Sequence, residues 1–455
     1  MRPGLVISGL ALLVTFAAFA AAAVAVRDVT WADLPVSVQQ ALAARKISAE
    51  SFPAWVKEIR AANDVRLRDG NFDHLIHYAL QSARVTSLPP IEPALSAKAF
   101  VESKKIPDDA RARLIAFAGV LSRSATAAAT ATSDARIAHF RGIVGDLRGA
   151  ALETRLIREY ERAMRFLYEK EFVAGRTKDS AAAVAALYQT RGHSSDTEIE
   201  AGYAVYAALA TLKQLALKPV TRVLIVGPGL DLAPRTALLE AADPQSYQPF
   251  AVIDALRTLH MTGAGAGAAD SLRLDAVDLN PHVASAIERA VRAPRLTLHV
   301  TSGIADTDRT RFTDDYRAYL ASFGLAIDAT HTQPEGAARG HARKTIPIAK
   351  DVQAAIHASR LDVVTERIAD GDGYDLVIVT NVFPYLSDPE LIVAIANIAA
   401  TLAPGGALIH NEPRPLLQST AASIGLPAVH ARSVLIATVP GGNDLYDAIW
   451  IHQKR

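Results

Sequence analysis

The stretch from Val223 to Gly229 constrains the fold of this chain most, because a buried strand there runs into a glycine turn. Four residues with high β propensity end at Val226 and are followed by Gly227, Pro228 and Gly229. A short apolar run that ends at glycines is typical of a buried parallel strand entering a tight turn. Such a turn lets the backbone approach a ligand closely.

A second apolar strand is predicted from Leu272 to Leu279, and it carries Asp278 at its end. A carboxylate at the tip of the next strand can accept hydrogen bonds from both hydroxyls of a ribose. The glycine turn, Asp278 and the adjacent Leu279 therefore predict one nucleoside site. The alternatives are an ordinary strand-to-helix turn for the glycines and a helix N-cap or surface carboxylate for Asp278.

From Val220 onward, short apolar runs alternate with helix-like segments, which indicates a parallel sheet wrapped by helices. Two late runs, Ser433–Val439 and Tyr446–His452, flank a Gly-Gly-Asn-Asp turn and predict an antiparallel hairpin. We expect an α/β fold, a Rossmann-like doubly wound and mostly parallel sheet with a terminal antiparallel hairpin. The expected parallel strands are 222–226, 272–278, 296–301, 361–365, 374–379 and 407–410.

Helical spacing dominates residues 27–190, which we expect to form a mostly helical domain. Two of its predicted helices are Ala54–Ala62 and Phe72–Ser82. A further helix, Asp196–Leu217, has Ser195 or Asp196 as its expected N-cap.

The first 26 residues carry an uncharged run from Leu5 to Val26 that is long enough to span a bilayer. The run also has the features of a secretory signal, with one arginine before it and small residues at a possible cleavage site. Signal peptide and uncleaved membrane anchor both stay open.

Taken together, these segments resemble the class I S-adenosylmethionine-dependent methyltransferase family over roughly residues 191–455. The resemblance includes the glycine turn, Asp278, the strand Tyr374–Val379 that leads to Asn381, and the Pro-Gly-Gly turn before the strand Ala407–His410. It implies a Rossmann-like methyltransferase-type domain with insertions near 243–269 and 302–355. It also implies S-adenosylmethionine as cofactor and methyl transfer to an unidentified acceptor.

The resemblance places six residues at the cofactor. Gly227, Pro228 and Gly229 would lie under its methionine part, Asp278 would hold its ribose, and Leu279 and Asn381 would adjoin it. For Asn381 the alternative is a side chain that caps its own loop. The third strand and the residue at the adenine are not assigned, although Glu366 is one candidate.

The chain departs from the family at two positions, where Ile225 replaces the usual acidic residue and Asp231 replaces the usual third glycine. Two other functions therefore stay open: an NAD(P)-dependent oxidoreductase, and a non-catalytic binding module that keeps the methyltransferase fold. The oxidoreductase reading conflicts with the missing third glycine and with an acidic residue about fifty rather than twenty positions downstream of the first glycine.

The composition excludes several other kinds of site. Because the chain has no cysteine, it has no disulfide, no zinc–thiolate site and no thiol nucleophile. The net charge of +1 gives no nucleic-acid signature. The histidines show no metal-ligand spacing, so we expect no metal, and the aromatic motif Phe383-Pro384-Tyr385 is interpreted as packing. No residue is assigned as a catalytic base.

The expected location follows from the cofactor, which is made and held in the cytoplasm. We expect residues 5–26 to anchor the chain in a membrane with the body in the cytoplasm; the alternative is export after signal cleavage. The expected partners are the small-molecule cofactor, an unidentified acceptor and, if the segment is uncleaved, the membrane.

Overall fold

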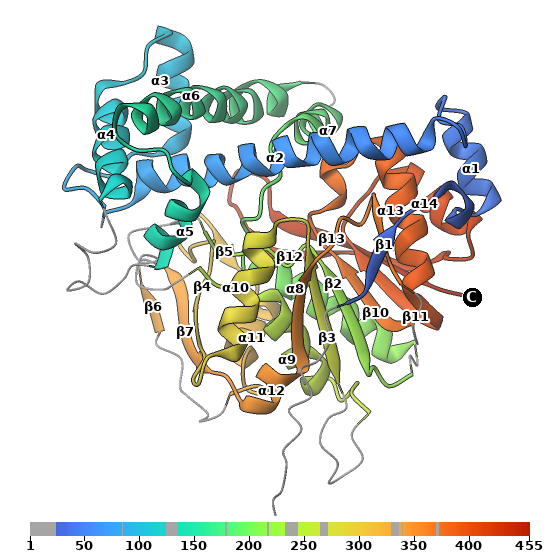
Figure 1. Ribbon diagram of the computed structural model, residues 1–455. Helices are drawn as coiled ribbons and strands as arrows, with labels where there is room; N and C mark the ends of the chain where they lie inside the picture. Colours follow the sequence, from blue (N-terminus) through green and yellow to red (C-terminus); the bar gives the residue numbers. More distant parts are fainter. Residues whose placement is uncertain are drawn as a thin grey trace, which may run out of the picture.

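The computed structural model describes residues 24–83, 85–123, 135–177, 180–215, 218–232, 244–263, 272–328, 336–338, 340–369 and 373–455. Within these ranges an α/β unit is built on an eight-stranded sheet, and a group of helices lies above it in Figure 1. The strand order in the sheet is β5-β12-β13-β11-β10-β2-β3-β8.

The sheet is parallel at its centre and antiparallel at one end, as expected. Its parallel strands are β8 (Ile356–Arg360), β3 (Arg273–Asp278), β2 (Arg222–Val226), β10 (Tyr374–Val379) and β11 (Leu402–His410). The predicted hairpin is confirmed, because β13 (Leu445–Gln453) runs antiparallel between β11 and β12 (Ala428–Thr438). The short strand β5 (Arg311–Phe312) pairs with the outer edge of β12.

The strand order reverses at β2, which confirms the doubly wound arrangement. The chain passes from β2 to β3 and β8 on one side, and later to β10 and β11 on the other. In open α/β sheets, ligands bind beyond the carboxyl ends of the strands at such a reversal. The glycine turn follows β2, so it lies at this point of the sheet.

Two of the expected parallel strands, 296–301 and 361–365, were wrong, because neither belongs to the main sheet. The strand beside β3 is β8, and Leu361–Thr365 is a turn that follows it. Residues Thr297–Thr301 form β4, which pairs with β7 (His341–Pro347) in a separate sheet that also contains β6 (Gly336–Ala338). The edge strand β8 reads Ile-His-Ala-Ser-Arg and is only half buried, so it lacks the continuous apolar run of a central strand.

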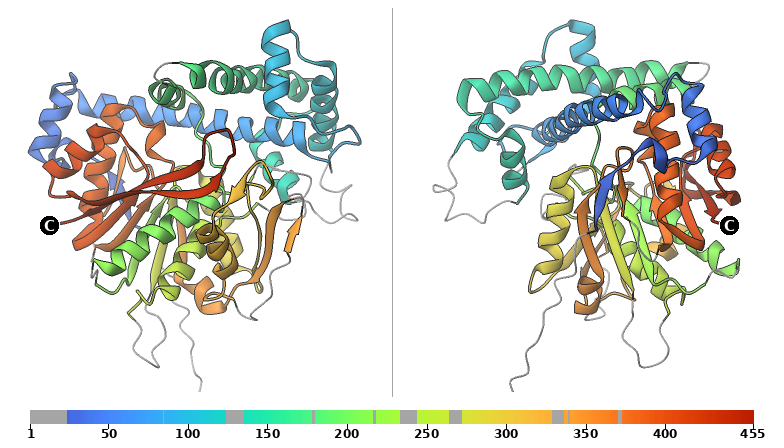
Figure 2. Two further views of the ribbon diagram at one scale, coloured as in Figure 1. Left: turned by 180° about the vertical axis from the view of Figure 1, so that it is seen from behind. Right: turned by 45° about the vertical axis from the view of Figure 1, so that its right-hand side comes forward.

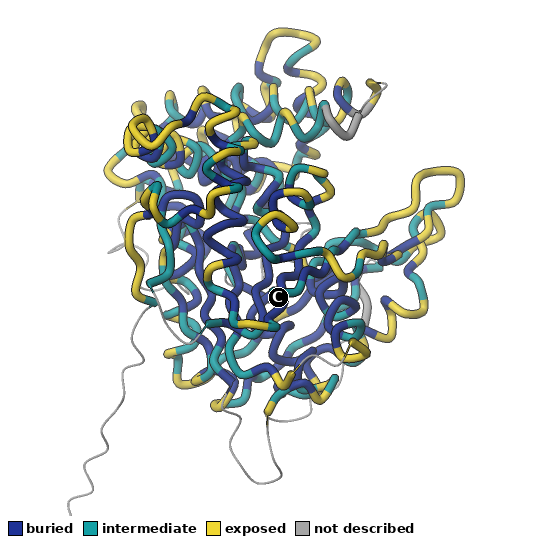
Figure 3. Tube along the Cα trace, turned by 90° about the vertical axis from the view of Figure 1, so that its right-hand side faces the viewer, coloured by how far each residue is buried: buried dark blue, intermediate teal, exposed yellow. Residues whose placement is uncertain are grey.

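Alternate side chains of β2 enter two different cores, as the period of a strand requires. Val223 and Ile225 pack with helices on one face, and Leu224 and Val226 pack with helices on the other. The first face carries α8 (Glu200–Gln214), α9 (Gln248–Thr258), α10 (Pro281–Arg292), α11 (Asp314–Ser322) and α12 (Lys350–Ala355). The second carries α13 (Asp388–Thr401) and α14 (Pro415–Ser423), and Figures 2 and 3 show the resulting layers and their buried centre.

The two segments that the sequence predicts as insertions hold defined structure. The first, 243–269, contains α9. The second, 302–355, contains β5, α11, β6, β7 and α12, so most of the small sheet belongs to it.

The region before the sheet is helical. Its helices are α1 (Val36–Ala43), α2 (Phe52–Gln81), α3 (Pro93–Ser103), α4 (Asp108–Ser122), α5 (Ala135–Val144), α6 (Gly149–Tyr168) and α7 (Ser180–Thr190). The expectation of two helices, Ala54–Ala62 and Phe72–Ser82, was wrong, because both belong to the 30-residue helix α2. The polar stretch that separates them in sequence is partly buried against the sheet, with Asn63, Gly70 and Asn71 among its buried residues.

The predicted N-terminal segment falls mostly outside the described residues, since 1–23 are not described. Its predicted boundary at residue 26 differs from the structure, where Val26 begins β1 (Val26–Asp28) and pairs with Ile368 of β9 (Glu366–Ile368). Within the described part of the chain, no helix has the length and apolar character needed to cross a bilayer.

Two glycines allow α2 to touch the segment that leads into the α/β unit. A Cβ added at Gly70 would lie 1.8 Å from the carbonyl oxygen of His193. A Cβ added at Gly192 would lie 2.3 Å from the backbone nitrogen of Gly70. The helix backbone is therefore in direct contact with residues 192–193.

We predict that Gly70→Ala destabilises the protein by about 1–3 kcal/mol, because the new methyl group must separate two backbones in contact. The matched control is Gly119→Ala in α4, where an added Cβ meets nothing within 4 Å. That change should stabilise by up to about 1 kcal/mol through helix propensity. Urea denaturation measures both, and equal stability of the two variants would contradict the packing described.

Candidate functional site

The turn after β2 requires glycine at two positions. Gly227 has φ +73° and Gly229 has φ +64°. Residues with a Cβ rarely adopt this left-handed backbone region. A Cβ at Gly227 would lie 2.3 Å from Cγ2 of Val382, and one at Gly229 would lie 2.8 Å from the carbonyl oxygen of Ser195. The turn thus packs against two neighbouring loops at the carboxyl end of β2.

Asp278 lies beside this turn at the end of β3, and it is 8% exposed. Burial raises the pKa of its carboxyl group to about 7, although the backbone N–H groups of Asn280 and Gly229 act in the opposite direction. The Asn280 N–H donates to Asp278 Oδ1 at 2.8 Å. No salt bridge to Asp278 is found among the described residues, so its charge is held by backbone groups alone.

A narrow cavity of about 120 Å³ joins these residues. Gly227, Gly229, Asp278, Leu279 and Asn381 all line it, so five of the six predicted residues come together. Pro228 is buried and lies outside the lining. Whether these residues hold a cofactor stays a prediction.

Helix α2 forms the roof of the narrow cavity through Asn63 and Leu67. The Asn63 amide donates to Asp362 Oδ2 at 3.0 Å, and its oxygen lies 2.9 Å from Nε2 of His193. Further along α2, the Oδ1 atom of Asn71 accepts from the Asn280 amide at 2.9 Å. The same amide donates to Ser195 Oγ at 2.8 Å. These buried hydrogen bonds fix the roof to the ends of β3 and β8.

Asn381 adopts φ +58° and does not cap its own loop. Its N–H donates to Asn411 Oδ1 at 2.9 Å, and the Asn411 amide donates to Asn381 Oδ1 at 2.7 Å. The pair joins the loop after β10 to the loop after β11. Asn381 therefore has a structural role as well as a place in the cavity wall.

Sequence reasoning missed several polar residues of the narrow cavity, among them Asn63, His193, Asp196 and Asp362. Asp362 lies near the candidate Glu366, but Glu366 is outside the lining and instead accepts from Arg360 and from the Asp362 N–H. A carboxylate two residues beyond a strand end was the available signal for Asp362. Nothing local marks Asn63, because it lies about 300 residues from Asp362 in the chain.

The predicted N-cap at Ser195 or Asp196 was wrong, since α8 begins at Glu200. Asp196 instead lies along the glycine turn, where its Oδ1 accepts from the Leu232 N–H at 2.9 Å. The side chain thus satisfies a backbone group of the turn region in place of a helix end.

The two departures from the family have local explanations. Ile225 is fully buried in the core beneath the sheet. Asp231 is buried, accepts from the Tyr247 hydroxyl at 2.6 Å, and bridges to Gln245. Leu230 and Asp231 form isolated β-bridges, to Asp196 and Gln245, so the position of the third glycine is extended backbone here.

A wide cavity of about 1000 Å³ adjoins the narrow one. The two share Ser194, Asp196, Thr197, Asn381 and Tyr385. The wide cavity is bounded by α7, the start of α8, the loop after β11 and the β12–β13 hairpin. The aromatic motif Phe383-Pro384-Tyr385, interpreted from the sequence as packing, contributes Pro384 and Tyr385 to the wall of the wide cavity.

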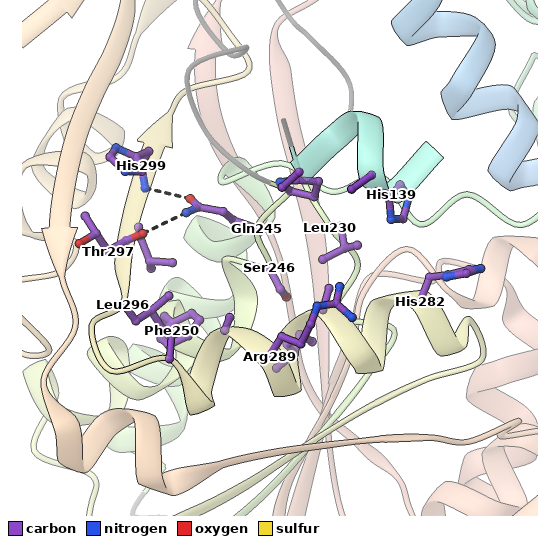
Figure 4. A pocket seen from close by; sticks show the side chains of 18 of the residues that line it. His139, Leu230, Gln245, Ser246, Phe250, His282, Arg289, Leu296, Thr297 and His299 are labelled. Atoms are coloured by element: carbon purple, nitrogen blue, oxygen red, sulfur yellow. Dashed lines mark hydrogen bonds between the residues drawn. The ribbon is translucent and has the colours of Figure 1, made fainter. Parts of the chain in front are cut away.

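A third cavity lies beside α10 and is lined by three histidines, His139, His282 and His299 (Figure 4). The His299 N–H donates to Gln245 Oε1 at 2.8 Å, and the Gln245 amide donates to the Thr297 carbonyl at 3.0 Å. His282 projects from α10 at the other end of this cavity in Figure 4. Within the ranges described, no group of three or more metal-ligating side chains is found.

The solved structures similar to this chain include methyltransferases. The N-methyltransferase NodS from Bradyrhizobium japonicum, in complex with S-adenosyl-L-homocysteine, is 13% identical with a TM-score of 0.27, over 55% of this chain and 87% of that one. Magnesium protoporphyrin IX methyltransferase from Synechocystis, with bound S-adenosylmethionine, is 12% identical with a TM-score of 0.27, over 57% and 82%. A TehB-like methyltransferase from Corynebacterium glutamicum is 13% identical with a TM-score of 0.26, over 63% and 98%.

No family model and no curated protein matches the sequence. The function therefore has to be inferred from the strand order, the glycine turn and the side chains of this chain.

We predict that Asp278→Asn stabilises the ligand-free protein above pH 7. The folded-state pKa of about 7 lies above the unfolded value of about 3.9, so the buried charge destabilises the fold fully above pH 7 and not at all below pH 4. The gain at pH 8 should be on the order of 1–3 kcal/mol.

Urea denaturation of both proteins at pH 8 and pH 5 measures this difference. The gain should shrink at pH 5, where the wild-type carboxyl group is protonated in the folded state. A variant that is less stable than wild type at pH 8 would contradict the environment described for Asp278.

Proposed function

We propose that this protein binds S-adenosylmethionine at the carboxyl edge of the sheet and transfers its methyl group to an acceptor. The observation that carries the proposal is the buried Asp278 carboxylate beside a glycine turn at the point where the strand order reverses. A buried carboxylate without a cationic partner is costly, and the hydroxyls of a ribose would donate further hydrogen bonds to it.

The residues of the narrow cavity fit a nucleoside. Asp278 offers acceptor oxygens, Gly227 and Gly229 bring the backbone of the turn into the cavity lining, and Leu279 and Val363 supply apolar walls. At about 120 Å³ this cavity is smaller than the roughly 300 Å³ at which ligand pockets begin, so a bound cofactor has to extend into the wide cavity. The shared residues Asp196, Thr197 and Asn381 mark where it would do so.

S-adenosylmethionine would supply a methyl group bonded to a positively charged sulfur. The methyl group would pass to the acceptor by in-line displacement, with the sulfur as the leaving group. The new bond joins a lone pair of the acceptor to the methyl carbon, and the pair of the broken carbon–sulfur bond returns to sulfur. The protein has to align the two reactants and keep water out. The roof formed by α2 and the walls of the wide cavity serve these two tasks, and no residue is assigned as a base.

Isothermal titration calorimetry tests the cofactor assignment. We expect S-adenosylhomocysteine to bind and NAD and NADP not to bind. Asp278→Asn should weaken S-adenosylhomocysteine binding at least tenfold, because charge-assisted hydrogen bonds contribute about 1.5–3 kcal/mol each.

The matched control is Glu366→Gln, which keeps the oxygen that accepts from the Asp362 N–H and lies outside the cavity lining. It should bind as wild type does. Binding of NAD in place of S-adenosylhomocysteine, or an unchanged affinity in Asp278→Asn, would overturn the proposal.

We also propose that residues 5–26 anchor the chain in a membrane and leave the body in the cytoplasm, where the cofactor is made. The support is the uncharged run itself, which is long enough to span a bilayer. The chain should stay with membranes after alkaline extraction, and its body should resist protease added outside the cell. Recovery of a shortened chain outside the cytoplasm would favour a cleaved signal instead.

A further inference from the structure

The wide cavity is strongly acidic. Among the described residues that line it, the basic side chains are Arg191 and Arg414, and the acidic ones are Asp196, Glu198, Glu200, Glu412, Asp444 and Asp447. A cavity wall with this excess of carboxylates attracts cations and repels anions.

Both arginines already have acidic partners. Nε of Arg414 lies 3.1 Å from Oε1 of Glu412 within the wall. A guanidinium nitrogen of Arg191 lies 3.5 Å from Oδ2 of Asp73, which is outside the cavity, and the same group stacks on Phe166 at 4.1 Å. Even with both arginines counted, six carboxylates face two basic side chains among the described lining residues.

Glu200 gives an independent indication of a missing partner. The residue is 5% exposed, and its Oε1 accepts from the Gly303 N–H at 2.8 Å and from the Tyr316 hydroxyl at 3.0 Å. Its Oε2 has no hydrogen-bond partner in the described part of the chain. A buried carboxylate oxygen without a donor is unfavourable, so a donor supplied by a ligand would stabilise this wall.

Aromatic rings border the same space. Tyr188 contacts Tyr385 edge to face, with ring centroids 5.4 Å apart, and both rings line the cavity. Tyr446 on the hairpin also lines it and is 64% exposed. Aromatic faces beside carboxylates are suited to organic cations, because the ring quadrupole attracts positive charge.

The acidic wall is connected to the cofactor cavity. Asp447 accepts from the Ala448 N–H at 2.8 Å and also hydrogen bonds to the Asn411 side chain. Asn411 in turn holds Asn381, which both cavities share. A molecule bound at the acidic wall would thus lie next to the proposed methyl donor.

We propose that the wide cavity binds a methyl acceptor that carries a positively charged amine group. That the ligand is a methyl acceptor rests on the proposed function, whereas its charge rests on the cavity alone. The ammonium group is the recognition element, held by the carboxylates and the tyrosine rings. The wall selects against acceptors whose recognition group is a carboxylate or a phosphate.

Calorimetry on the full chain with 1,6-diaminohexane tests the proposal, with and without saturating S-adenosylhomocysteine. The neutral 1,6-hexanediol and the dianion octanedioate are the matched probes. We expect the diamine to bind, more weakly as salt is added, and the other two probes not to bind.

The variant Glu198→Gln with Asp444→Asn removes two carboxylates of the wall and should weaken diamine binding roughly fivefold. The control variant, Glu58→Gln with Glu102→Gln, removes two exposed carboxylates from α2 and α3, away from the cavity, and should bind as wild type does. Equal diamine affinity in the two variants would overturn the proposal, as would a preference for the diol or the dianion. Diamine binding that behaves as expected in a protein that does not bind S-adenosylhomocysteine would uphold the cation site and refute the methyl donor.

Discussion

The packing of helix α2 against the carboxyl edge of the sheet is the interaction on which the rest of the site depends. Gly70 and Gly192 bring two backbones into contact, and the amides of Asn63 and Asn71 hydrogen bond to residues that follow β8 and β3. Buried amide hydrogen bonds are costly to break, because each broken pair leaves unsatisfied groups. A helix that the sequence divides into two is thereby held as one roof over the narrow cavity. Figure 1 shows α2 running across the α/β unit.

The roof also explains the unusual state of Asp278. Because α2 and the Ser195–Thr197 segment exclude water from the end of β3, the carboxylate loses solvation and its pKa rises to about 7. A protein that keeps a destabilising carboxylate in a cavity is expected to use it, because strained or costly groups gather at functional sites. The wide cavity shows the same pattern at Glu200, whose second oxygen has no donor among the described residues.

The sequence allowed the central strands and the core of the site to be predicted, because their signals are local. The run before Gly227 is β2, residues Tyr374–Val379 are β10, and the hairpin forms where its turn residues indicate. A glycine turn and a strand-end carboxylate are each visible within a few residues. The turn, Asp278 and Asn381 therefore meet where three parallel strands end at the same edge of the sheet.

The remaining features depend on partners far away in the chain. The edge strand β8 alternates between buried and exposed residues and so lacks the signal of a central strand. Asn63 and Asn71 are polar residues of α2 that are buried because their side chains hydrogen bond to those of Asp362 and Asn280. Asp196 accepts a hydrogen bond from the backbone N–H of Leu232 and does not cap a helix. Local propensity cannot report pairings of this kind.

The central claim is that the glycine turn and Asp278 form a nucleoside site that opens into the acidic cavity. A crystal structure of the full chain with S-adenosylhomocysteine tests it most directly. We expect ribose hydroxyls within hydrogen-bond distance of the Asp278 carboxylate, with the sulfur facing the cavity bounded by Asn381 and Tyr385. A ligand bound elsewhere, or one whose ribose makes no contact with Asp278, would contradict it.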